Sequence, residues 1–93
     1  MRQYELIYIV HPELDEDALS EVIDRVSSWI SDEDGEITNT ELWGKRKLAY
    51  PIRKQPEGYY VVMQTKMNMT ADSQLERNLS ILEPVMRYSI ISI

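Results

Sequence analysis

The sequence contains no cysteine, only one histidine and only three glycines in 93 residues. Without cysteine the chain has no disulfide, no thiol nucleophile and no cysteine metal site. Three scattered glycines form neither a G-x-G-x-x-G fingerprint nor a phosphate-cradling loop. The single histidine, His11, stands beside Pro12, where a turn residue is a better interpretation than a catalytic base. We therefore expect no enzyme, no metal or other cofactor, and no small-molecule substrate.

Long apolar runs are also missing. No stretch approaches the roughly 20 apolar residues that span a bilayer, so we expect a soluble protein without a membrane partner. Glu5 interrupts the apolar N-terminal run and no cleavage site follows it, which favours a strand over a leader peptide. The length and the 43% hydrophobic content predict one domain over residues 1–93. The lack of cysteine fits a cytosolic or plastid-like compartment.

Charge is unevenly distributed along the chain. The formal net charge of −6 argues against nucleic-acid binding by the whole surface. Ten of the sixteen acidic residues fall within residues 13–36. This acidic run is either a solvated helix face or a surface that attracts a basic protein, and the pattern leaves both interpretations open.

A basic cluster occupies residues 43–58, WGKRKLAYPIRKQPEG. It holds half of all the lysine and arginine, with no acidic residue between Glu41 and Glu57. Tyr50 and two prolines interleave with the charges, and each proline favours an extended conformation in the residue before it. A stiff basic segment with an aromatic side chain suits a phosphate-rich partner, although a solvated loop would explain the composition too. The five cations are Lys45, Arg46, Lys47, Arg53 and Lys54.

Hydrophobic periodicity predicts six elements in the order β-α-β-β-α-β. These are strands over residues 3–10, 36–43, 58–67 and 85–93, and helices over residues 16–31 and 71–82. Residues 45–50 can extend the second strand as one arm of a protruding hairpin. Asp15 and Thr70 are the expected N-caps, and Gly35 is expected to supply the unusual backbone conformation of the turn before the second strand. The order is typical of a ferredoxin-like α+β fold, in which two helices cover one face of a four-stranded antiparallel sheet.

Strand alternation divides the side chains between the two sheet faces. The predicted helix-facing residues are Leu6, Tyr8, Val61, Met63, Tyr88 and Ile90, and Met86 is expected on the same face of the last strand as Tyr88 and Ile90. The predicted outward residues are Ile7, Ile9, Tyr60, Val62, Arg87 and Ile91. An outward face this apolar suggests a protein partner or self-association, and a one-residue slip in register would reverse both assignments. Residues 57–62 partly imitate an RNA-recognition motif, but acidic Glu57 stands where a cation is expected.

Three blocks of the chain carry a resemblance to a known family. They are MRQYELIYIVHPEL, WGKRKLAYPIRKQPEGYYVVM and LERNLSILEPVMRYSIIS. Together they resemble the sixth protein of the bacterial small ribosomal subunit over nearly the full chain. The resemblance implies a ferredoxin-like fold, binding to the central domain of small-subunit ribosomal RNA, and pairing with the strongly basic eighteenth protein of that subunit. It also implies a cytoplasmic ribosomal location in a bacterium or plastid.

Residues at family-typical basic or aromatic positions are Arg2, Tyr4, Arg46 and Arg87. The chain departs from the family pattern at Pro84 and stops at Ile93 without the usual charged tail.

The sequence thus predicts a non-enzymatic structural constituent of the ribosome. Its expected RNA contacts are the five cations together with Arg2, Tyr4, Tyr50 and Arg87. Its expected protein-partner contacts are Ile7, Ile9, Tyr60, Val62 and Ile91. The alternative is a small regulatory domain of the same fold that dimerises through its sheet and binds a metabolite. Five cations within residues 45–54 favour the phosphate-rich partner.

Overall fold

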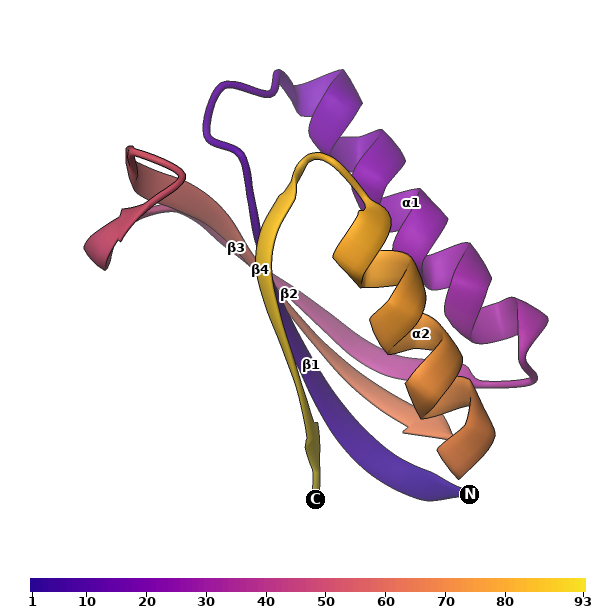
Figure 1. Ribbon diagram of the computed structural model, residues 1–93. Coiled ribbons are helices and arrows are strands. Elements are labelled where there is room, and N and C mark those ends of the chain that lie inside the picture. The colour runs from indigo at the N-terminus through magenta and orange to yellow at the C-terminus, as the bar shows by residue number, and fades with distance from the viewer.

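The computed structural model, which describes residues 1–93, contains four strands and two helices. The elements are β1 (Arg2–Val10), α1 (Glu16–Asp32), β2 (Glu36–Ile52), β3 (Gln55–Met67), α2 (Met69–Ile81) and β4 (Val85–Ser92). The sheet order is β2-β3-β1-β4, and every neighbouring pair is antiparallel. Both helices lie on the same face of the sheet (Figure 1). The predicted ferredoxin-like fold is confirmed.

The first helix, α1, is stabilised at its start by the predicted cap. Asp15 has an extended backbone, and its Oδ1 accepts a hydrogen bond of 2.8 Å from the backbone N–H of Ala18. This bond satisfies a donor that the first turn of a helix leaves unpaired. The apolar stripe then buries Val22, Val26 and Ile30 against the sheet. The helix ends at Asp32, one residue later than expected.

The turn after α1 uses its glycine for a reason other than the predicted one. Asp34, not Gly35, adopts the left-handed conformation, with φ of 60°. A Cβ at Gly35 would lie 2.7 Å from the backbone oxygen of Ile30, closer than Cβ atoms approach other atoms in proteins. The backbone N–H of Gly35 donates a 2.8 Å hydrogen bond to that same oxygen. Gly35 therefore permits a close approach of two backbone segments.

The second helix, α2, begins earlier than predicted. Its N-cap is Asn68 and not Thr70, and no side chain makes a capping hydrogen bond there. Ala71, Leu75 and Leu79 are buried. Ala71, which was expected to be the first helical residue, is instead the third and packs in the core as part of the helix's apolar stripe.

The core lies between the helices and the sheet. Leu6, Tyr8, Val61 and Met63 are buried there as predicted, with partly buried Tyr88 and Ile90 against them. Met86 is on the other face, contrary to the prediction. A bulge lets Val10 pair with Val85 and Ile9 with Arg87, so that Met86 is an extra residue in β4. It packs instead with Ile9 and Leu48.

Candidate nucleic-acid interface

The basic cluster forms the distal half of the β2–β3 hairpin. The two strands pair out to Ile52 and Gln55, which leaves Arg53 and Lys54 as a two-residue turn. Both turn residues have positive φ, 50° and 64°, the pattern of a type I′ turn that normally uses Asn or Gly. The hairpin end bends away from the helices (Figure 1). The predicted hairpin is confirmed, and β3 begins three residues earlier than expected.

Contacts with β4 and the segment before it hold the hairpin end in place. Arg53 donates hydrogen bonds from Nη1 to the Glu83 carbonyl at 2.8 Å and from Nη2 to the Val85 carbonyl at 3.2 Å. Arg87 donates from Nη1 to the Tyr50 hydroxyl, and its guanidinium lies 5.4 Å from the centroid of the Tyr50 ring. The hairpin end is thus held in position by these contacts and is not a flexible loop.

A small apolar cluster packs the hairpin end against β1 and β4. Leu48 is buried against Ile9 and Met86, with partly buried Ile52 and Tyr60 beside them. Gly58 provides the space for this packing, because a Cβ there would overlap Ile9 Cγ2 and lie 3.0 Å from Met86 Cε. The face of the sheet opposite the helices is therefore covered at its hairpin end by the chain itself.

Opposite charges lie on opposite layers of the molecule. The helices and their adjoining loops, residues 11–35 and 68–84, carry twelve of the sixteen acidic residues and two of the ten basic ones. The strand regions carry the other eight basic and four acidic residues. The helix layer therefore has a formal charge of −10 and the sheet layer +4. The hairpin cations are all exposed on the positive layer.

The other expected RNA contacts separate into three groups. Arg87 joins the hairpin through Tyr50. Arg2 is exposed but pairs with Met67 at the opposite end of the sheet, so it does not belong to the same cluster. Tyr4 is only 4% exposed and packs in the core under the helices. Its side chain therefore offers almost no surface to RNA, because β1 directs it to the helix-facing side.

The expected protein-partner residues share the face predicted for them. Across three strands, Val62 pairs with Ile7 and Tyr60 pairs with Ile9, while Ile91 pairs with Glu5. Their exposures differ, however. Val62 is 3% exposed and Ile9 is 8% exposed, so neither offers much surface to a partner.

Part of this face remains available to a partner. Ile91 is 48% exposed. A shallow hollow of about 100 Å³ is lined by Ile7, Ile9 and Arg87 among others.

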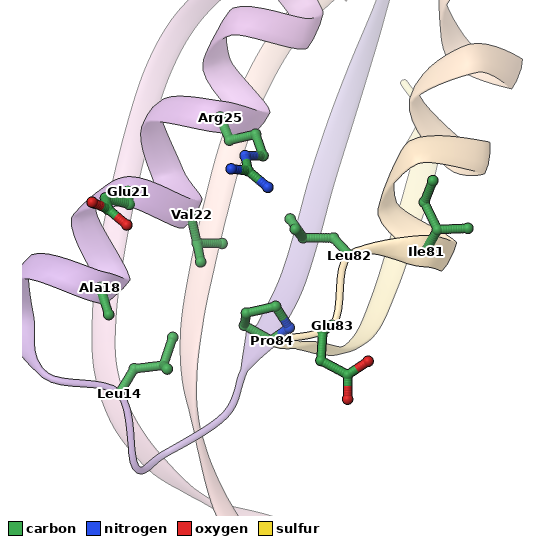
Figure 2. Close-up of a pocket in the computed structure, with 9 residues that line it drawn as sticks. All are labelled: Leu14, Ala18, Glu21, Val22, Arg25, Ile81, Leu82, Glu83 and Pro84. Carbon is green, nitrogen blue, oxygen red and sulfur yellow. The ribbon is translucent and has the colours of Figure 1, made fainter.

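Two larger hollows flank α1. One, of about 380 Å³, lies between α1 and the segment joining α2 to β4, with Leu82 and Pro84 facing α1 (Figure 2). Its charged residues are Glu21, Arg25 and Glu83. The other, of about 400 Å³, lies between α1 and the β2–β3 strands.

No group of three His, Asp or Glu side chains is placed to hold a metal ion. None of the helices has the length and apolar character needed to cross a membrane.

One arrangement on the hairpin was not predicted. Trp43 stacks on Tyr60 with ring centroids 6.1 Å apart and planes inclined by 11°. The signal in the sequence was Trp43-Gly44 inside a strand pattern, since an isolated strand glycine often marks a bulge. The Arg53 contacts had no such signal, because their acceptors are backbone oxygens about 30 residues away.

The fold and the surface define a class: a small ferredoxin-like α+β protein that presents a cationic, aromatic hairpin on an otherwise acidic body. The sequence profile described as ribosomal protein S6 matches residues 3–92. The chain belongs to the ribosomal protein S6 family, which confirms the resemblance carried by the three sequence blocks.

Individual relatives agree with this membership. The chain is 45% identical to small ribosomal subunit protein bS6 of Carboxydothermus hydrogenoformans over 91 residues, covering 98% of this chain and 95% of the relative. It is 47% identical to small ribosomal subunit protein bS6 of Thermoanaerobacter pseudethanolicus, covering 98% and 96%. The crystal structure of 30S ribosomal protein S6 from Thermotoga maritima superposes with a TM-score of 0.94 at 28% identity, covering 99% of this chain and 87% of that one.

Proposed function

We propose that the chain is a non-enzymatic structural constituent of the small ribosomal subunit in the cytoplasm. In this role it binds the central domain of small-subunit ribosomal RNA together with the basic eighteenth protein of that subunit. Family membership and the names of its relatives support the ribosomal role. The observation that carries RNA binding is the group of exposed cations on a hairpin that the rest of the fold holds in shape.

The separation of charge by layer gives the binding an orientation. Phosphates attract the hairpin cations and repel the acidic helix layer, so approach of RNA to the sheet layer is favoured. A uniformly basic protein would lack this preference. The net charge of −6 is then compatible with RNA binding, because the local field at the hairpin decides where RNA docks.

The protein partner fits the remaining part of the outward sheet face. Ile7 and Ile91 provide apolar contact area there, and Tyr60 and Arg87 stand at its hairpin end. A strongly basic partner would also be drawn by the acidic helix layer during encounter. RNA and protein would thus occupy adjoining parts of one sheet face.

The salt dependence of RNA binding tests the proposal. The triple variant Lys45→Ala, Lys47→Ala and Lys54→Ala should lower the slope of log affinity against log salt by about 0.7–0.9 for each side chain that neutralises a phosphate. The matched control removes three cations outside the basic distal half of the hairpin, Arg25, Lys66 and Arg77, and should retain the slope. Binding to a central-domain transcript, with the basic partner present, gives both slopes. Equal slopes in the two variants would remove the hairpin from the RNA site.

A further inference from the structure

A bulge in β2 displaces Trp43 from the regular ladder. Leu42 pairs with Val61 and Gly44 pairs with Tyr60, which leaves Trp43 as the extra residue. Gly44 has φ of +80°, and no atom lies within 4 Å of where its Cβ would be. The glycine is therefore required by backbone conformation and not by lack of space. A bulge of this kind re-aims a neighbouring side chain, here Trp43.

The re-aimed indole lies flat against Tyr60 but is not part of a core. The two rings are nearly parallel, 11° apart, with centroids separated by 6.1 Å. Trp43 is 44% exposed and belongs to neither hydrophobic cluster. An indole that serves only packing is normally covered by other side chains. Trp43 instead has an orientation set by its stacking on Tyr60 and a surface that remains accessible.

One cation lies over this indole. The guanidinium of Arg46 lies 5.5 Å from the Trp43 ring centroid, and its Nε donates a 3.3 Å hydrogen bond to the Trp43 carbonyl. Lys45 lies over the Tyr59 ring at 5.4 Å, but Tyr59 packs against the helix-side core and Tyr60 against the opposite face, so Lys45 is not part of this group. Oriented aromatic planes beside cations are the combination by which proteins bind unpaired nucleotides, with stacking on the base and charge on the phosphate.

We propose that Trp43, backed by Tyr60, is a stacking platform for one unpaired RNA base, and that Arg46 contacts the phosphate next to that base. The inference rests on the proposed RNA-binding function and adds to it a particular nucleotide subsite. An apolar protein side chain would also fit an indole. The flanking Arg46 favours RNA, because its charge would repel the basic protein partner and attract phosphate.

Fluorescence gives a direct test. In a Trp29→Phe variant, Trp43 is the only tryptophan, and a central-domain rRNA transcript should quench its emission when it binds. Trp43→Leu should weaken binding by about 5- to 150-fold at fixed salt, the range for loss of one base stack. The log-log salt slope should stay unchanged, because no charge is lost. Trp43→Tyr retains an aromatic plane and should recover most of the affinity. Thermal melts of each variant verify that it is folded.

The outcomes separate the subsite from the parent proposal. RNA binding without quenching, together with unchanged affinity of Trp43→Leu, would overturn the platform and leave RNA binding intact. Quenching by the basic partner protein alone, with no further change on adding RNA, would overturn it in favour of a protein contact. Failure of the wild-type protein to bind the transcript, even with its basic partner, would overturn both.

Discussion

The guanidinium of Arg53 donates a 2.8 Å hydrogen bond to the backbone carbonyl of Glu83, which joins the tip of the β2–β3 hairpin to the segment that leads into β4. A second bond from the same side chain reaches the carbonyl of Val85. Arg53, a member of the basic cluster, therefore uses its hydrogen-bond donors within the protein itself. Arg53 positions the hairpin, while Lys45, Lys47 and Lys54 have no such contact with backbone oxygens.

Replacing Arg53 with lysine separates charge from positioning. The Arg53→Lys variant would keep the positive charge but lose the planar fork that reaches two carbonyls. We expect amides within residues 47–57 to exchange with solvent about fivefold faster, corresponding to about 1 kcal/mol of lost hydrogen bonding, with little change in global stability. Hydrogen exchange measured by NMR tests this. The control Lys54→Gln removes a charge without a clamp and should leave exchange unchanged. Unaltered exchange in the Arg53→Lys variant would contradict a positioning role.

Gly58 is the position where an added methyl group should be most damaging to the apolar cluster under the hairpin. An alanine Cβ would overlap Ile9 Cγ2 and crowd the backbone oxygen of Val10 at 3.3 Å. Overpacking of this kind costs about 1–3 kcal/mol. Denaturant unfolding of Gly58→Ala measures the loss. A double-mutant cycle with Ile9→Ala, which vacates the space, should show that the two costs are less than additive. Strict additivity would mean that the clash with Ile9 is not the cause.

The sequence was sufficient for the fold because each element carries its own local signal. Alternation in β1 and the helical stripe of α1 depend on neighbours within a few residues, as does the Asp15 cap. Two features were missed where distant parts of the chain decide. The bulge that moves Met86 to the other face depends on how β4 meets β1, and the bonds of Arg53 depend on oxygens in another element.

The sequence was enough to predict which residues make up the candidate site, but not how they are arranged. The cation cluster and Tyr50 were visible in the sequence, and the structure places them on one hairpin. Tyr4 was expected to contact RNA from its family-typical position, whereas strand alternation places it on the buried side with Leu6 and Tyr8. The Trp43–Tyr60 stack depends on a bulge in β2. Gly44 signals that a bulge can occur there, but it does not tell in which direction the bulge turns the Trp43 side chain.

Tyr8 carries the one buried side-chain polar atom that lacks a hydrogen-bond partner, its hydroxyl oxygen. Leaving a buried hydroxyl unpaired costs about 1–3 kcal/mol. Tyr8→Phe removes that cost and should raise the melting temperature at neutral pH. Half-buried Tyr88 offers a control. Tyr88→Phe removes a hydroxyl that is not buried without a hydrogen-bond partner, so it should not raise the melting temperature in the same way. A lower melting temperature for Tyr8→Phe would show that the hydroxyl makes a stabilising interaction.

The same residue predicts how stability depends on alkaline pH. Burial raises the pKa of the Tyr8 phenol above its ordinary value of about 10. Since the unfolded chain ionises this phenol first, its contribution to stability is fully present below about pH 10 and is lost progressively as the pH rises above that value. Tyr8→Phe has no phenol to ionise and therefore lacks this pH-dependent contribution. Denaturant unfolding between pH 9 and 11.5 should therefore show a shallower loss of stability in the variant than in the wild type, and equal slopes would contradict the assignment.

Ile91 is the outward-facing residue best suited to test the protein-partner surface, because it is 48% exposed and lies opposite Glu5. Ile91→Lys should leave thermal stability within about 0.5 kcal/mol, as surface changes usually do. It should nevertheless weaken association with the basic eighteenth protein at least about tenfold, or about 1.4 kcal/mol, because it removes apolar contact and adds a like charge. Isothermal titration calorimetry measures the affinity. The matched control is Ile81→Lys, the same change on α2 at a side chain that is 76% exposed. That variant should bind within about threefold of wild type. Equal losses for both substitutions would mean that net charge and not the sheet face governs association, and an intact affinity for Ile91→Lys would place the partner elsewhere.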